Sequence, residues 1–409
     1  MSGHAEEGEV KRSTVAEIKS HAKRLGPRLV AWRRHLHMHP EPSMQEHETA
    51  AFVEARLREI GVDSVRTGVG ETGVVGLIRG RGRRTVGLRA DMDALELEEA
   101  NQVPYRSRRP GLMHACGHDG HVACLLGTAA ILKAMRNQLP GNVKLVFQPG
   151  EEGAGGAARM IADGVLDHPK VSAIAALHVD TETACGKVAI RRGYHTAQVD
   201  DIALTVRGKT SHVARPDLGV DAISVACQVF LAIQQFVARH TNALDRKLIG
   251  FGLISGGTRM NVVADRVRLE GTIRTIEPEG REALLRFLKR DASRLAASMG
   301  ARLQVEIRES YPPLANDDRV VDVVAASACD LVSESNVVQI ERPVLGGEDF
   351  SYFALAGVPA AMFGLGIRDE KKGFAAPGHN ANFDFPDRRV LPLGAAMLAA
   401  VAVRLLEQV

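Results

Sequence analysis

Short apolar strands alternate with helical segments along the first half of the chain, and polar side chains follow where several of the strands end. The expected strands are residues 85–88, 142–147 and 173–177, and the polar residues that follow them are Asp91, Asp93, Glu151, Glu152 and His178. A mostly parallel α/β sheet gives this alternation and gathers chemistry at the carboxyl ends of its strands. We therefore expect these side chains to meet at one edge of a sheet.

The segment from about Val199 to Arg308 breaks that pattern. Its expected elements follow the order β-α-β-β-α-β, namely strand 201–206, helix 220–238, strands 247–253 and 267–273, helix 281–299 and strand 303–307. Such a run forms a ferredoxin-like two-layer sandwich. A chain of 409 residues also exceeds the usual size of one core. We expect an α/β domain in two parts, residues 1–198 and 311–409, with residues 199–310 as an inserted domain.

Composition narrows the classes of partner. The chain is 45% hydrophobic and 25% charged, as in an ordinary globular protein. Its 52 Lys and Arg against 49 Asp and Glu are scattered, which argues against a nucleic-acid surface. The acidic, polar N-terminus does not resemble a secretory signal, and no apolar run approaches the ~20 residues that cross a bilayer. Five cysteines without a CxxC pair fit a reducing cytoplasm. We expect a cytoplasmic protein that binds neither nucleic acid nor membrane.

The densest group of metal-ligand side chains lies at residues 114–121, with the sequence HACGHDGH. Imidazole, thiolate and carboxylate are the groups that divalent transition metals accept. Cys116 and His118, two residues apart, can point the same way from extended backbone, and Gly117 lets the chain approach a metal closely. Adjacent carboxylates such as Glu151 and Glu152 point in different directions, so one can bind metal while the other transfers a proton.

Seven motifs in register resemble the amidohydrolase branch of the metallo-aminoacylase and carboxypeptidase family, which includes hippurate hydrolases, aminoacylases and auxin-conjugate hydrolases. They are RHLH at 34–37 with Pro40-Glu41, RADMDAL at 89–95, HACGHDGH at 114–121, FQP at 147–149 with Glu151-Glu152-Gly153, LHV at 177–179, GGEDF at 346–350, and His379 with FDF at 383–385. The likeness runs from about residue 30 to the end. It implies a mostly parallel-sheet, di-metal catalytic domain with an inserted ferredoxin-like lid and dimerisation domain.

The resemblance also implies a role for each matching residue. Cys116 would bridge two divalent ions. Two cations of this kind lower the pKa of a shared water and polarise a carbonyl. His118 and His178 would complete one metal site, and Glu152 and His379 the other. Glu151 would act as the general base. Manganese or zinc is expected, and the mixed ligands also admit cobalt or nickel. The remaining polar residues would orient ligands or simply pack: Asp91, Asp93, Asp119, His114 and His121.

The inserted domain carries further candidates. The segment GKTSH at 208–212 resembles the family's lid, whose histidine reaches the active site of the partner subunit in a homodimer. His212 would then donate a hydrogen bond to the tetrahedral oxyanion. Asn261 and Arg274 match lid positions that grip a substrate carboxylate, a task that suits the planar fork of arginine.

The expected reaction is hydrolysis of the C–N bond of small N-acyl amino acids or related carboxylated amides. Two departures leave the substrate open: residues 193–197 (GYHTA) are bulkier and more polar than in relatives, and residues 368–374 form an insertion containing Lys371 and Lys372. Alternatives are a dipeptidase or carboxypeptidase on the same scaffold, and hydrolytic removal of an amino group from an aromatic substrate. A thiol enzyme with Cys116 as nucleophile and a non-catalytic binding protein are further alternatives.

Overall fold

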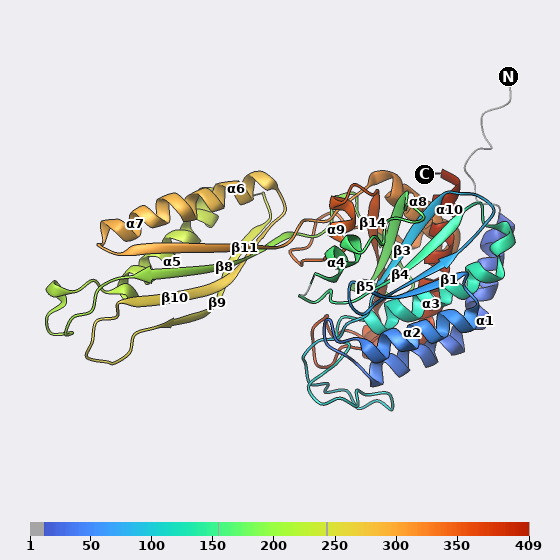
Figure 1. Ribbon diagram of the computed structural model, residues 1–409, viewed down its shortest axis with the longest axis horizontal. Coiled ribbons are helices and arrows are strands. Elements are labelled where there is room, and N and C mark those ends of the chain that lie inside the picture. Colours follow the sequence, from blue (N-terminus) through green and yellow to red (C-terminus); the bar gives the residue numbers. More distant parts are fainter. Residues whose placement is uncertain (1–11, 154, 243, 409) are drawn as a thin grey trace, which may run out of the picture. The chain divides into compact units, whose positions relative to one another are not determined.

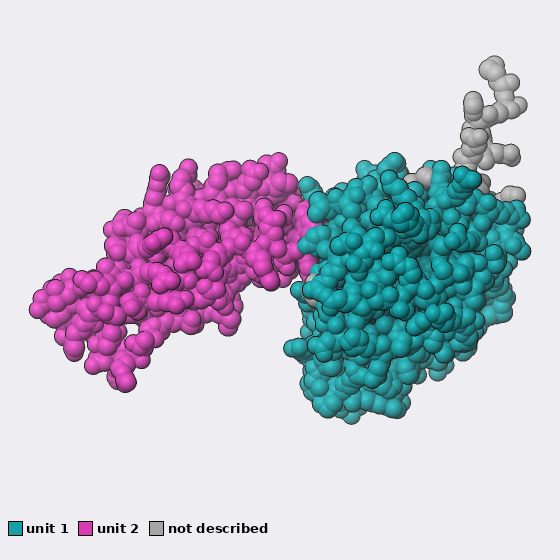
Figure 2. Space-filling view, in the orientation of Figure 1, with its two compact units in different colours: residues 1–195, 315–342, 349–409 teal, residues 196–314, 343–348 magenta. Residues whose placement is uncertain are grey.

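A computed structural model describes residues 12–153, 155–242 and 244–408 and divides the chain into two compact units (Figure 1, Figure 2). Unit 1 comprises Met1–His195, Ala315–Arg342 and Asp349–Val409, and unit 2 comprises Thr196–Leu314 and Pro343–Glu348. From the sequence, the inserted domain was expected at 199–310, and residues 343–348 were expected in the other domain. The short segment belongs to unit 2 because Ala197 N–H donates to Gly346 O (3.0 Å) and Arg274 Nη1 donates to Leu345 O (2.8 Å).

Unit 1 is built on an eight-stranded mixed sheet in the order β1-β2-β4-β3-β5-β14-β6-β13. The central strands β4, β3, β5 and β14 are all parallel to their neighbours in that run. The strands are β1 (Ser64–Val69), β2 (Gly73–Ile78), β3 (Thr85–Asp91), β4 (Asn142–Gln148), β5 (Ala173–Ala184), β6 (Val188–Ile190), β13 (Val337–Gln339) and β14 (Ala360–Arg368). A separate two-stranded ladder pairs β7 (Gly193–Tyr194) with β12 (Ala315–Asn316). Every residue of β3 and β4 is buried, as expected for strands with both faces covered.

Helices cover the sheet of unit 1 and complete its core (Figure 1). They are α1 (Arg12–Met38), α2 (His47–Ile60), α3 (His118–Ala134), α4 (Gly156–Ala162), α8 (Asp318–Val332), α9 (Ser351–Leu355) and α10 (Asp387–Gln408). Helix α3 is buried along nearly its whole length, because β3 lies on one side of it and α1 and α10 lie on the other. Its first residue, His118, is therefore held in the core of the unit.

Unit 2 is a four-stranded antiparallel sheet in the order β11-β8-β10-β9 with helices packed on it. Its elements are β8 (Gln198–Arg207), α5 (Ala222–Arg239), β9 (Lys247–Gly256), β10 (Arg266–Thr275), α6 (Pro278–Arg286), a π-helical turn (Phe287–Ala292), α7 (Ser293–Ser298) and β11 (Arg302–Tyr311). The predicted β-α-β-β-α-β order is confirmed. Asp221 caps α5 by accepting a hydrogen bond from Ile223 N–H (2.9 Å).

Two helices, α5 and α10, are long and apolar enough to cross a bilayer by length and composition alone. In α10 the apolar stretch is 83% buried within the protein, which is the environment of a core helix. In α5 only 28% of the stretch is buried, since one face packs on the sheet and the other lies on the surface of unit 2.

Candidate metal centre

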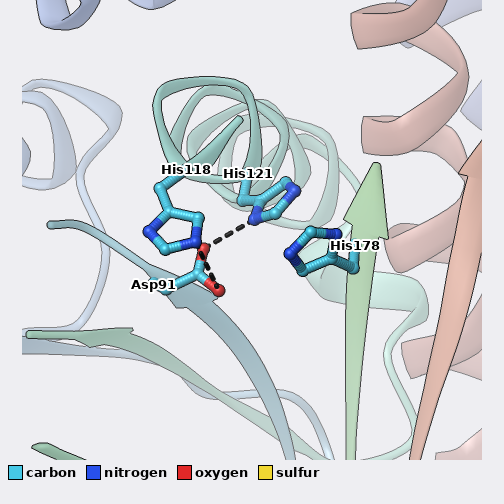
Figure 3. Close-up of side chains that lie close together, drawn as sticks. All are labelled: Asp91, His118, His121 and His178. Carbon is cyan, nitrogen blue, oxygen red and sulfur yellow. Dashed lines mark hydrogen bonds and ion pairs between the residues drawn. The ribbon is translucent and has the colours of Figure 1, made fainter. Parts of the chain in front are cut away.

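The predicted ligands meet in unit 1: His118 begins α3, His178 lies on β5, Glu152 follows β4, and Cys116 and His379 lie on loops. Figure 3 shows Asp91 at the end of β3, His118 and His121 at the start of α3 and His178 on β5 converging, with ligand atoms within 4.8 Å of one another. A second group joins Cys116, Glu152 and His379 within the same limit. The strand expected to end before His178 continues as β5 to Ala184, because β14 pairs with it beyond that point.

The two groups are connected through the cysteine. The Sγ atom of Cys116 lies 3.4 Å from Nε2 of His178, and Oε1 of Glu152 lies 3.3 Å from Nε2 of His379. Burial alone would raise the pKa of the Cys116 thiol, but the neighbouring charges of His178 and His118 outweigh it and lower the pKa to about 6. The structure thus gathers all five predicted ligands near the sulfur of Cys116.

Hydrogen bonds fix which imidazole nitrogens can bind a cation. Nδ1 of His178 lies 2.8 Å from Val179 O, and Nδ1 of His118 lies 2.9 Å from Asp93 O. A carbonyl oxygen can only accept, so both Nδ1 atoms carry a proton, and Nε2 is the nitrogen of each ring that a cation can bind when the ring is neutral. Nε2 of His118 and Oε1 of Glu152 are buried and meet hydrogen-bond geometry with no residue that the structure describes; their near neighbours include each other (3.9 Å) and, for Glu152, Nε2 of His379 (3.3 Å). Buried polar atoms are rarely left without partners, so these atoms fit a metal site.

His121 and His114 are placed differently. Nδ1 of His121 lies 2.6 Å from Asp91 Oδ1, and its Nε2 accepts a hydrogen bond from Val179 N–H (2.9 Å). Both nitrogens are engaged, so His121 orients Asp91 and the strand that carries His178. The imidazole of His114 is fully enclosed, and burial lowers its pKa to about 4. It is a neutral packing residue.

A buried arginine anchors Asp91. Arg89 donates through Nη1 to Asp91 Oδ2 (2.6 Å), through Nη2 to Asp349 Oδ1 (3.0 Å) and through Nε to Gln148 Oε1 (2.8 Å). Burial would raise the pKa of Asp91, but His118 and Arg89 hold it well below the usual range. A charged Asp91 therefore faces His118 and His121.

The sequence analysis missed this network and a second one around Arg33, which is fully buried between Asp119 (Nε to Oδ2, 2.7 Å) and Asp384 (Nη2 to Oδ1, 2.9 Å). The signal in the sequence was the positive charge of each arginine in an otherwise apolar setting. An arginine directly after the apolar strand predicted at 85–88, or on the buried face of an amphipathic helix, is rarely enclosed unless it is paired.

Glu151 and Glu152 have different sets of neighbours. Glu152 belongs to the group with Cys116, whereas a carboxylate oxygen of Glu151 lies within 4.8 Å of ligand atoms of His118 and Glu152. Glu151 is 6% exposed. Its carboxylate is therefore buried beside the ligands without belonging to the Cys116 group.

His379 has an unusual backbone. Its φ is 58°, in the left-handed region that residues other than glycine rarely adopt and that is often found at functional sites. Its N–H donates to Ala115 O (2.8 Å), next to Cys116. This hydrogen bond holds the imidazole over the cysteine loop.

The candidates of unit 2 fall at two places. His212 forms an isolated bridge with Val262, and Val213 N–H donates to Asn261 O (3.1 Å), so His212 and Asn261 lie on adjacent exposed segments before β10 begins. Arg274 lies near the far end of β10. It lies eight positions after Arg266, which corresponds to about 27 Å along an extended strand. The structure brings His212 and Asn261 together, and it does not bring Arg274 to them within the unit.

Comparison with known proteins supports the resemblance seen in the motifs. The sequence profile of peptidase family M20/M25/M40 matches residues 87–404. Thermostable carboxypeptidase 2 of Saccharolobus solfataricus is 38% identical over 395 residues, covering 95% of this chain and 98% of the relative. N-acetyl-L-cysteine deacetylase of Bacillus subtilis is 38% identical over 344 residues, covering 83% of this chain and 81% of the relative. The crystal structure of the Bacillus subtilis YXEP protein, described as a dinuclear metal-binding peptidase of the M20 family, superposes with a TM-score of 0.82 at 30% identity, covering 95% of this chain and 99% of that one. The chain therefore belongs to peptidase family M20/M25/M40 and is a metal-dependent amidohydrolase of that family.

Proposed function

We propose that the protein hydrolyses the amide bond of small N-acyl amino acids or related carboxylated amides. The carrying observation is the divided carboxylate pair. Glu152 lies in the ligand group of Cys116, and Glu151 is buried directly beside it. A ligand cluster alone would suit metal storage, whereas a second carboxylate next to the ligands suits proton transfer. The relative that deacetylates N-acetyl-L-cysteine supports an acyl amino acid as substrate.

We infer that the site holds two divalent ions, with Cys116 between them. His118 and His178 would hold one ion, and Glu152 and His379 the other. Manganese or zinc is our expectation, and cobalt or nickel also suits these ligands. When bound, such ions polarise the scissile carbonyl and lower the pKa of a water. The chain's own contribution is the proton transfer: Glu151 accepts the proton of the attacking water and delivers it to the leaving nitrogen.

We propose that unit 2 supplies substrate contacts and joins two chains in a homodimer. Arg274 is tied to Leu345, four residues before Asp349, so we assign it to the substrate carboxylate of its own chain. His212 and Asn261 lie toward the opposite end of β10, and we assign them to the active site of the partner subunit. There His212 would donate a hydrogen bond to the oxyanion.

The surface of unit 2 supports this dimer. Strand β9 is an edge strand of its sheet, and Leu253 and Ile254 on it are 66% and 67% exposed. Leu231 on the neighbouring helix α5 is 57% exposed. An apolar edge strand beside an apolar helix face is a surface that a second copy commonly covers.

Two other reactions would use the same metal centre. A carboxypeptidase on the same scaffold is supported by the relative from Saccharolobus solfataricus, and hydrolytic deamination of an aromatic substrate would use the same centre. A thiol enzyme based on Cys116 and His178 leaves Glu152 and His379 without a role. A chelator would spare a thiol enzyme and would abolish the activity of the proposed centre.

The test is a hydrolysis screen with metal-reconstituted protein over N-acetyl, N-benzoyl and indole-acetyl amino acids, with dipeptides and aryl amines in parallel. We expect turnover of acyl amino acids. Glu151→Gln should keep its metal content while its rate falls by about two to four orders of magnitude, and the exposed Glu182→Gln should behave as the parent protein. Activity of Glu151→Gln within tenfold of the parent, or turnover of dipeptides alone, would contradict the proposal.

A further inference from the structure

A cavity of about 690 Å³ opens between α1 and α10 in unit 1. Its volume falls within the ~300–1,000 Å³ typical of small-molecule sites. Its lining comes from one face of each helix with one residue of α8: Lys19, Ala22, Lys23, Gly26, Pro27 and Val30, then Arg388, Arg389, Pro392, Leu393 and Ala396, and Leu331. None of these residues belongs to the metal cluster. The cavity, here called the α1–α10 groove, is thus a separate feature.

The groove forms where glycine, alanine and proline residues of the antiparallel helices α1 and α10 face each other. The helices are fastened where Arg34 Nε donates to Asp387 Oδ2 (2.7 Å). They approach again at Gly26, where an added Cβ would lie 3.5 Å from Pro392 Cγ. Pro27 and Pro392 lie inside their helices, and an internal proline bends a helix and removes one of its hydrogen bonds. The side chains therefore leave a gap that packing does not fill.

The rim of the groove is positively charged. Four cations line it, and none of its lining residues is acidic. Lys19 Nζ donates to Asp330 O (2.8 Å), and Arg389 pairs with Asp369 (3.0 Å). The exposed Lys23 and Arg388 have no ion pair or hydrogen bond with any residue in the described part of the chain. Two cations without partners border an apolar floor.

The cations lie toward the two ends of the groove. Lys19 and Lys23 are on the early part of α1, whereas Arg388 is at the start of α10, which runs antiparallel and lies near the later part of α1. From Lys19 to Val30 the helix rises about 16 Å. An extended apolar chain fits this length, and a negatively charged group at its end would reach Lys23 or Arg388.

We propose that the α1–α10 groove binds an amphiphilic carboxylate, with its acyl chain against Pro27, Leu393 and Ala396 and its carboxylate paired with Lys23 or Arg388. The apolar floor supplies the hydrophobic contact. The unpaired cations select the sign of the head group, because the residues that line the groove include four cations and no carboxylate. The proposal concerns a site apart from the metal centre and does not depend on which amide the protein hydrolyses.

The test is calorimetric titration of the full, metal-loaded protein with dodecanoate below its micelle concentration. We expect one molecule bound per chain, and no binding of dodecyltrimethylammonium, which has the same alkyl chain and the opposite charge. Lys23→Glu/Arg388→Glu should weaken dodecanoate binding at least tenfold. The control Arg81→Glu/Lys170→Glu makes the same change in net charge at exposed positions outside the groove and should stay within twofold.

A second variant separates the groove from the metal centre. Val30 is partly buried and lines the cavity, so Val30→Trp should fill it and abolish binding while amide hydrolysis continues. Unchanged dodecanoate affinity in Val30→Trp would place the ligand elsewhere and overturn the proposal. Equal binding of the ammonium, or sedimentation with phosphatidylglycerol vesicles without any dodecanoate binding, would overturn it as well.

Discussion

Gly117 shows how one backbone position controls the metal ligands. It lies between Cys116 and His118 with φ +94°, and an added Cβ would lie 2.5 Å from Cγ2 of Val179, the residue after His178. A side chain here must push the cysteine loop away from the β5 ligand. The glycine is therefore required both by its φ and by this close approach.

We predict that Gly117→Ala lowers metal affinity at least tenfold, because three ligands are displaced together. Gly111→Ala is the matched control, since its φ is +73° and nothing lies within 4 Å of its added Cβ. It should cost only backbone strain, about 1 kcal/mol, and keep its metal. Metal content after dialysis checks both variants. Equal metal loss in the two would show that φ alone matters and that contact with Val179 does not.

At the scale of elements, the sequence identified the strands that carry chemistry, because their apolar runs end at polar residues. The inserted domain was predictable for the same reason: its stripe Val225, Val229 and Ile233 repeats with helical period and is buried on the sheet. Other features depend on distant pairing. The extension of β5 requires β14, and the assignment of 343–348 to unit 2 requires Arg274. A local pattern does not contain such contacts.

Lys144 links β4 to the loop that precedes β5 by hydrogen bonds. Its ammonium donates to the carbonyl oxygens of Val165 (2.7 Å), Asp167 (2.7 Å) and Pro169 (2.9 Å). Lys144→Met keeps an unbranched side chain that is one atom shorter and removes all three hydrogen bonds. We predict a loss of about 1–3 kcal/mol in the free energy of unfolding, measured by denaturant titration, with metal content unchanged. The control Lys170→Met, at an exposed position, should change the free energy of unfolding by less than 0.5 kcal/mol. An equal loss in the two variants would show that the hydrogen bonds of Lys144 do not stabilise the fold.

At the scale of the whole molecule, the metal ligands could be located from the sequence, whereas the place where the substrate-binding residues act could not. The cluster of Cys116, Glu152 and His379 forms within unit 1, so the motifs that resemble those of the family were enough to find it. His212 and Arg274 both belong to unit 2 and lie at different ends of it. A single chain does not show what would bring them to one substrate, and the proposed dimer supplies that step.

The dimer makes a prediction about mixtures of inactive proteins. If His212 acts in the partner's active site, Glu151→Gln and His212→Ala each disable both sites of their own homodimer. In a mixed dimer, the site on the His212→Ala chain keeps its own Glu151 and receives His212 from the Glu151→Gln chain. That site has both residues, so mixing should restore part of the activity, up to about one quarter of the parent rate when half of the dimers are mixed and one of their two sites works. Leu231→Asp/Ile254→Asp, which places charge on the exposed apolar face of unit 2, should give monomers and abolish the recovery. If mass measurements confirm subunit exchange and the mixture stays inactive, His212 acts within its own chain or has no catalytic role.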